Sequence, residues 1–263
     1  MRAYRIAYDG QPYHGFQRQP DVETVEGELL AALDRLGVTD GGVPAGYAAA
    51  GRTDAGVSAL AQTVAFEAPA WLSPAAFNSE LPAAVRAWAS ADVPEDFHAT
   101  HDAREREYVY HLYAPERHDD RARRAADALA GEHDFHNLTP DDRGTVRSLS
   151  IDLAREAAFL VCRLRAGGFC RQLVRRVVGL VDEIRRGEAP VSKVDRGLDS
   201  EPIDGAAGVG PAPPTPLVLT GVEYDISFSV DDAARESARS VFADRVAERR
   251  AGARVAEEIR DGV

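Results

Sequence analysis

Segments with the period of β-strands alternate along this sequence with segments of helical period, and this order limits the possible folds more than any other feature. Alternating large and small residues at 4–8 predict a half-buried strand. An amphipathic helix over 25–36 follows, and strands are predicted at 62–66 and 85–89. We therefore expect residues 1–103 to form one α/β half.

The same alternation continues in the rest of the chain. It predicts strands at 104–113, 149–153, 159–164 and 217–224, and helices at 122–129 and from Phe169 to Ile184. The proline- and glycine-rich stretch 202–216 predicts a linker or an extended wrap. We expect residues 104–230 to form a second α/β half and 231–263 a charged helical tail without chemistry. This order predicts an α+β fold with mainly antiparallel sheets.

The charge composition is unusual. The chain of 263 residues has a net charge of −12, which argues against nonspecific nucleic-acid binding. Of its 31 basic residues, only Lys193 is a lysine. An acidic excess with almost no lysine indicates adaptation to high salt, where charges are screened over roughly 3 Å at 1 M. Local charge is then a better guide to partners than net charge.

The sequence also limits where the protein works. No apolar run is long enough to cross a bilayer, and the first residues lead into a strand instead of a signal peptide. We expect a cytoplasmic protein that does not bind membranes. Cys162 and Cys170 form no metal-binding pattern, and we expect both to be reduced and buried.

One segment reverses the overall charge. Seven arginines lie between 163 and 186, and within the segment only Asp182 and Glu183 oppose them. A solvated helix face rarely concentrates arginine in this way in an acidic protein. The segment therefore predicts contacts to the phosphates of a nucleic acid.

A short glycine-bracketed loop is the strongest candidate for chemistry. Gly51 and Gly56 enclose Arg52, Thr53 and Asp54. Such a loop is either an ordinary surface turn or a turn that presents the Asp54 carboxylate to a closely approaching ligand. A phosphate-handling enzyme is disfavoured, because no Gly-Lys-Ser/Thr follows. A non-catalytic RNA-binding module is the main alternative to an enzyme, although binding alone does not require this carboxylate.

The stretch Gly51-Arg52-Thr53-Asp54-Ala55-Gly56-Val57 resembles the catalytic signature of the tRNA pseudouridine synthase A (TruA) family. Further family motifs occur in the expected order over roughly residues 4–225, and this ordered set is far more specific than one motif. The matching stretches are Tyr8-Asp9-Gly10 with Gly15-Phe16-Gln17, Asp96-Phe97-His98-Ala99, Tyr108-Val109-Tyr110, Gly131-Glu132-His133-Asp134-Phe135, Val174-Arg175 with Val178-Gly179, and Pro216-Leu217.

The resemblance implies two ferredoxin-like (RRM-like) α/β halves whose sheets join around a central catalytic cleft. It implies a homodimer that binds tRNA and needs no cofactor or metal, and the composition points to a haloarchaeal source. The reaction would convert uridine to pseudouridine in the anticodon stem-loop, at positions 38, 39 and/or 40 of the tRNA. The uracil would be flipped out, detached from its sugar, turned and rejoined through carbon.

The family's site residues map onto this sequence by motif. Asp54 would be the nucleophilic or proton-abstracting carboxylate, attacking either the base or the sugar carbon, and Arg175 would be its ion-pair partner. Tyr108 would stack on the uracil and could act as the final base, and Leu217 would line the uracil pocket. Arg52 and, in the arginine-rich segment, Arg171 would contact RNA.

Two positions depart from the family pattern. Ser58 stands where many members have histidine, and Arg171-Gln172 stands where a histidine pair is common. Both departures concern the range of RNA targets more than the reaction. The helical wheel also leaves open whether Arg175 points into a cleft or into solvent.

Overall fold

The computed structural model describes residues 1–116, 118–203 and 208–263. The elements of the N-terminal part follow the predicted order: β1 (Arg2–Tyr8), α1 (Val25–Arg35), β2 (Ala48–Ala49), β3 (Ser58–Phe66), α2 (Pro74–Asn78) and β4 (Val85–Asp92). Thr24 caps α1, because its hydroxyl accepts a hydrogen bond from the amide of Gly27. Gly37 follows the helix in the left-handed region, at a φ of 69°.

The C-terminal part also keeps the predicted order. Its elements are β5 (Glu105–Tyr113), α3 (Asp119–Leu129), β6 (Gly131–Asp134), the 3-10 turn η1 (His136–Leu138), β7 (Val146–Glu156), β8 (Phe159–Ala166), α4 (Leu173–Arg186), α5 (Lys193–Gly197), β9 (Leu217–Glu223), β10 (Ser229–Val230) and α6 (Asp232–Gly262). The predicted strands and helices of this part are confirmed, apart from one boundary.

Helix α4 begins at Leu173, so the prediction that it starts at Phe169 was wrong. The backbone before the helix is bound to a neighbouring loop instead. The amide of Arg171 donates to Asp141, the carbonyl of Arg171 accepts from the Thr139 hydroxyl, and Gln172 is left-handed at a φ of 58°. Phe169 and Arg171 therefore lie in a loop at the entrance to the helix and not on its surface.

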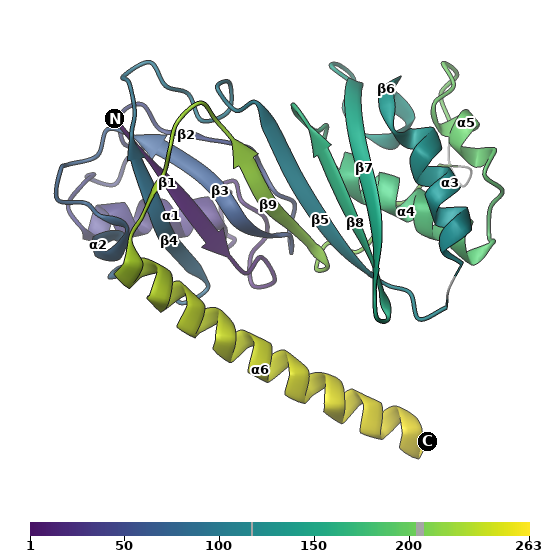
Figure 1. Ribbon diagram of the computed structural model, residues 1–263. Coiled ribbons are helices and arrows are strands. Elements are labelled where there is room, and N and C mark those ends of the chain that lie inside the picture. The colour runs from purple at the N-terminus through teal and green to yellow at the C-terminus, as the bar shows by residue number, and fades with distance from the viewer. Residues whose placement is uncertain (117, 204–207) are drawn as a thin grey trace.

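The strands of the described residues form one large open sheet in the order β10-β4-β1-β3-β9-β5-β8-β7-β6, with β2 paired to β3 (Figure 1). The prediction of mainly antiparallel pairing is confirmed. Strand β9 is the exception, because it runs parallel to β3 while pairing antiparallel with β5. This late strand joins the two parts of the sheet, next to the loop that precedes β3.

Helices cover one face of the sheet in two groups. Helices α1 and α2 pack on β1, β3 and β4, and helices α3 and α4 pack on β5, β7 and β8. Tyr108 contacts both cores. A cleft lies between these two groups of helices and is lined by residues of both α1 and α4.

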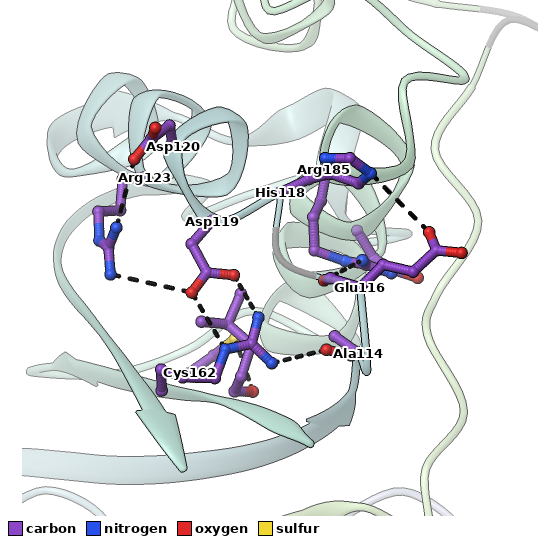
Figure 2. Close-up of polar contacts among 11 residues, drawn as sticks. Ala114, Glu116, His118, Asp119, Asp120, Arg123, Cys162 and Arg185 are labelled. Atoms are coloured by element: carbon purple, nitrogen blue, oxygen red, sulfur yellow. Dashed lines mark hydrogen bonds and ion pairs between the residues drawn. The ribbon is translucent and has the colours of Figure 1, made fainter. Parts of the chain in front are cut away.

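Helix α3 is fastened by its first turn. Asp119 accepts from Arg155 of β7, whose guanidinium also donates to the carbonyl of Ala114 (Figure 2). This ion pair holds the outer helix against the end of the sheet.

Helix α6 lies on the opposite face of the sheet. It starts beside β4 and extends as one long helix to the C-terminus (Figure 1). Ala234 and Ala238 are buried against β4, and the Asp231 carboxylate caps the helix by accepting from the amide of Ala234. The tail is thus a docked helix for its first turns.

Candidate active site

The loop between β2 and β3 is a turn, as its composition suggested. The amide of Val57 donates to the carbonyl of Asp54 over 3.1 Å, and Gly56 has a φ of 80°. A positive φ at the third residue of such a turn favours glycine. Gly56 also lies against Pro214, because a Cβ there would stand 3.1 Å from that ring.

The segment that follows β1 holds this turn in place. The amide of Phe16 donates to the carbonyl of Thr53 over 3.0 Å, and the Tyr8 hydroxyl lies 2.8 Å from that of Thr53. Tyr13 and Phe16 are buried, so these aromatic rings support the loop and do not stack on bases. This segment therefore acts as a buttress of the Asp54 turn.

Asp54 meets an arginine from the other end of the fold. Arg175 Nη1 donates to Asp54 Oδ2 over 2.9 Å, and the side chains are 14% and 32% exposed respectively. Arg175 Nε donates to the carbonyl of Ala212 over 2.7 Å, which fixes the guanidinium from its other side. Arg175 thus points into the cleft, which the helical wheel left open.

The extended segment 208–216 makes this arrangement possible. The amide of Ala212 donates to the carbonyl of Arg175, and Arg176 donates to the carbonyl of Val209. The prediction of an extended wrap holds for this segment, and residues 204–207 of that stretch lie outside the described residues. The wrap lays β9 beside the turn that carries Asp54.

Tyr108 stands on β5 beside the carboxylate. Its ring packs edge-on against Phe169, with 5.2 Å between ring centroids. Burial raises the pKa of Tyr108 well above its ordinary value, and the negative charge of Asp54 adds to that effect. The phenol is therefore neutral at ordinary pH.

A cleft of about 910 Å³ brings these groups together. All six residues predicted for the site line it: Asp54, Arg175, Tyr108, Arg52, Leu217 and Arg171. Leu217 is buried at the start of β9 and forms an apolar wall with Leu219 and Val222. Arg52 is exposed, and no hydrogen bond or ion pair engages it in the described part of the chain.

The cations of the arginine-rich segment have protein partners in the structure, and the expected phosphate contacts of this segment stay a prediction. Arg163 and Arg165 pair with Glu107, and Arg171 pairs with Asp141 over 2.6 Å. Arg185 is buried, pairs with Asp182 and donates to the carbonyl of Glu116 (Figure 2). Most of the opposing acids come from distant strands and loops. Arg171 still differs from the others, since its side chain is 67% exposed at the cleft.

Sequence reasoning did not predict how Gln62 and Arg106 shape the site. Gln62 is fully buried, and its amide nitrogen donates to the carbonyl of Gly51 over 2.9 Å. Arg106 donates to the carbonyls of Ala50 and Gly167, which ties the turn to the loop before α4. A glutamine in a mostly apolar, buried strand was the available signal for Gln62.

The described residues contain no group of three or more His, Cys, Asp or Glu side chains arranged to hold a metal ion. Cys162 and Cys170 are buried free thiols, as predicted. Among the helices that the structure describes, none is both long enough and apolar enough to span a membrane.

The chain thus combines an open mixed sheet with a carboxylate turn at its central cleft. A family model described as tRNA pseudouridine synthase matches residues 125–225. A tRNA pseudouridine synthase A of Haloarcula marismortui is 64% identical over 100% of both chains, and one of Natronomonas pharaonis is 62% identical over 97% of both. One of Methanothrix thermoacetophila is 42% identical over 87% of this chain and 85% of its own.

This chain belongs to the tRNA pseudouridine synthase A family, and it is an isomerase that forms pseudouridine in tRNA. The first two relatives come from halophilic archaea, in agreement with the acidic, lysine-poor composition.

Proposed function

We propose that this enzyme isomerises uridine in the anticodon stem-loop of tRNA, at one or more of positions 38, 39 and 40, with Asp54 as the reacting carboxylate. The observation that carries the proposal is the Asp54–Arg175 ion pair inside the cleft. Arg175 holds the carboxylate in one orientation, and Asp54 keeps enough exposure to meet a substrate atom.

The reaction is balanced within the nucleotide. The bond from the sugar C1′ to N1 of the uracil breaks, a bond from C1′ to C5 forms, the proton at C5 leaves and N1 gains a proton. Asp54 attacks either the base or C1′ and is released at the end, so no redox partner is consumed. The protein must supply a carboxylate in a fixed orientation, space in which the base can turn, and a proton acceptor.

A uridine inside a stem or a stacked loop cannot reach a carboxylate at the floor of a cleft, so the base is flipped out. Leu217 and Leu219 give the uracil an apolar wall, and Tyr108 gives it an aromatic face. The volume of the cleft leaves space for the base to rotate between detachment and rejoining.

The raised pKa of Tyr108 supports a defined order of roles. The neutral phenol stacks on the uracil first, because burial and the Asp54 carboxylate disfavour the phenolate. Once Asp54 forms a bond to the substrate, it loses its negative charge and one cause of the raised pKa disappears. The phenol of Tyr108 then releases its own proton more readily, and it must do so before its oxygen can accept the C5 proton.

Arg52 and Arg171 are proposed to contact RNA phosphates at the rim of the cleft. Both are exposed, and both stand beside the space into which the nucleotide would flip. High salt screens the overall negative charge of the protein, so local cations act only at close range.

We further propose a cytoplasmic homodimer built from two ferredoxin-like halves, 1–103 and 104–230, with a helical tail, 231–263. The supporting feature for the dimer is α6. At about 100° per residue, Gly252 and Ile259 fall within about 20° of the buried Ala234, yet Ile259 is exposed. The helix is net positive over 245–254 and net negative over 255–263, which suits antiparallel pairing with a second copy.

Sedimentation analysis tests this surface. Ile259→Glu is expected to shift the protein from dimer to monomer, whereas Val246→Glu, which alters an exposed valine on another face of α6, is expected to leave it dimeric. A monomeric unaltered protein would refute the dimer.

The function is tested with unmodified tRNA transcripts. After incubation with the enzyme, pseudouridine is mapped by chemical labelling and primer extension. We expect product only in the anticodon arm, and transcripts with cytidine at positions 38, 39 and 40 are expected to yield none. Product confined to another part of the tRNA would overturn the proposed target.

A further inference from the structure

A buried carboxylate lies at the end of β1, outside the cleft. Asp9 is 3% exposed, and Arg249 of α6 donates to its Oδ2 over 2.6 Å. Arg249 donates from the same nitrogen to the Gln11 side chain over 3.0 Å. Arg245 stands 3.9 Å from Asp9, beyond hydrogen-bond distance. The hydrogen-bonded cation at Asp9 is therefore Arg249, which lies 240 positions away along the chain.

The neighbours of Asp9 are the residues that hold the catalytic turn. Tyr8 contacts the Thr53 hydroxyl, and the amide of Gly10 donates to the Ser58 hydroxyl over 3.0 Å. Gly10 is so close to the turn that a Cβ there would lie 2.0 Å from the carbonyl oxygen of Val57. A displacement of Asp9 would therefore be transmitted directly to both ends of the turn that carries Asp54.

Ser58 shows that this contact lies outside the cleft. It lines a separate space of about 480 Å³ between the sheet and α6, together with Asp9 and Arg249. The departure at Ser58 thus concerns the support behind the turn and not the wall of the cleft.

Helix α6 reaches Asp9 from a fixed base. Its start is anchored by Asp231, which also accepts from the amide of Ala75 over 3.1 Å. In the described part of the chain, Arg249 is the last residue of α6 that hydrogen-bonds to another element, since the later side-chain pairs, such as Arg254 with Glu257, lie within the helix. The last hydrogen bond between α6 and another element in the described part of the chain is therefore made to Asp9, behind the turn that carries Asp54.

We propose that Arg249 is a positioning residue: through Asp9 it braces the 51–57 turn from behind and thereby fixes Asp54. The inference rests on the proposed role of Asp54. A carboxylate buried at this depth needs close partners. Without Arg249, Asp9 keeps only the longer 3.9 Å ion pair with Arg245 and the hydrogen bond from the Gln11 amide, so we expect the carboxylate to shift and to move Gly10 with it. Lysine would restore the charge at Asp9, but its compact ammonium reproduces the shared contact with Gln11 less well.

The test compares Arg249→Ala, Arg249→Lys and Arg250→Ala by steady-state kinetics with an anticodon-arm substrate, at high KCl. Arg250 is exposed on the same helix and is the matched control. We expect kcat to fall about tenfold in Arg249→Ala, because small displacements of a reacting group cost that much or more. KM should stay within about twofold, since Arg249 lies outside the cleft. Arg249→Lys should recover part of the loss, and Arg250→Ala should match the unaltered enzyme.

A double variant, Asp9→Asn with Arg249→Ala, separates the brace from general weakening. If the two residues act as one unit, it is expected to be no slower than the worse single variant. Additive losses, an unchanged kcat in Arg249→Ala, or an equal loss in Arg250→Ala would each refute the proposal.

Amide hydrogen exchange gives a readout that does not depend on turnover. Exchange over residues 53–58 is expected to be about tenfold faster in Arg249→Lys and faster still in Arg249→Ala, while exchange in the core of β8 stays unchanged. Unchanged exchange at 53–58 would overturn the brace. If instead the unaltered enzyme makes no pseudouridine and exchange still responds, the proposed chemistry fails and the brace stands.

Discussion

Arg175 and Asp54 are 121 positions apart in the sequence, and they form a 2.9 Å ion pair at the floor of the cleft. The pair exists because α4 and the 208–216 wrap bring the arginine over a turn that β1 and its following loop hold rigid. The glycine-bracketed loop by itself indicates only a turn. The ion pair with Arg175 in the cleft makes its aspartate, Asp54, a candidate reacting group.

Asp54→Asn is expected to abolish pseudouridine formation while preserving the fold and tRNA binding. The amide keeps the size of the side chain but cannot act as a nucleophile, and loss of such a group lowers kcat by at least about 10⁴-fold. Product mapping and a filter-binding assay measure the two effects. Full activity in this variant would end the proposed mechanism.

Arg175→Lys is expected to lower kcat about 100-fold, because a single ammonium cannot hold Asp54 and the Ala212 carbonyl in the same geometry. Arg176→Lys is the matched control, since Arg176 binds the same wrap at Val209 without contacting Asp54. Steady-state rates on tRNA measure both. Equal losses in the two variants would mean that the wrap, and not the orientation of Asp54, limits the rate.

Arg171→Glu is expected to weaken tRNA binding about tenfold at low salt and less at high salt, because it replaces a proposed phosphate contact with a repulsive charge. Asp141→Asn leaves the Arg171 cation without its acidic partner and is expected to bind tRNA at least as tightly as the unaltered protein. Arg186→Glu, on a cation paired with Asp182 and Glu188, should have little effect. An unchanged affinity in Arg171→Glu would remove this residue from the RNA interface.

Because several tyrosines have raised pKa values, we expect the protein to lose stability at alkaline pH. Burial raises the pKa of Tyr4, Tyr110 and Tyr224 to about 12 and also raises that of Tyr108. In the unfolded chain these phenols titrate near pH 10. Above about pH 10 the unfolded state therefore holds fewer protons than the folded state, and the free energy of unfolding falls as the pH rises toward 12.

Urea unfolding measured between pH 8 and pH 12 tests this, together with absorbance titration of the phenols. Below about pH 10 the tyrosines should contribute no slope. In the folded Tyr108→Phe variant, the number of phenols that titrate above about pH 10 should be one lower than in the unaltered protein. Titration of every tyrosine near pH 10 while the protein is still folded would contradict the predicted burial.

By itself, the sequence determined the local features of this protein. The alternation at 4–8 and 104–113, the Thr24 cap and the glycines around Asp54 specify strands, a helix start and a turn through interactions between near neighbours. The ordered family motifs identified six candidate site residues, and all six line one cleft.

Only the tertiary structure decided which charges meet. The arginines of 163–186 look unpaired because their acids, such as Glu107 and Asp141, lie far away in the chain. The start of α4 was misplaced for the same reason, since Asp141 and Thr139 take the backbone groups of Arg171. The pairing of Arg249 with Asp9 joins the two ends of the chain. Such contacts depend on how β9 joins the two parts of the sheet, and no local sequence pattern encodes that arrangement.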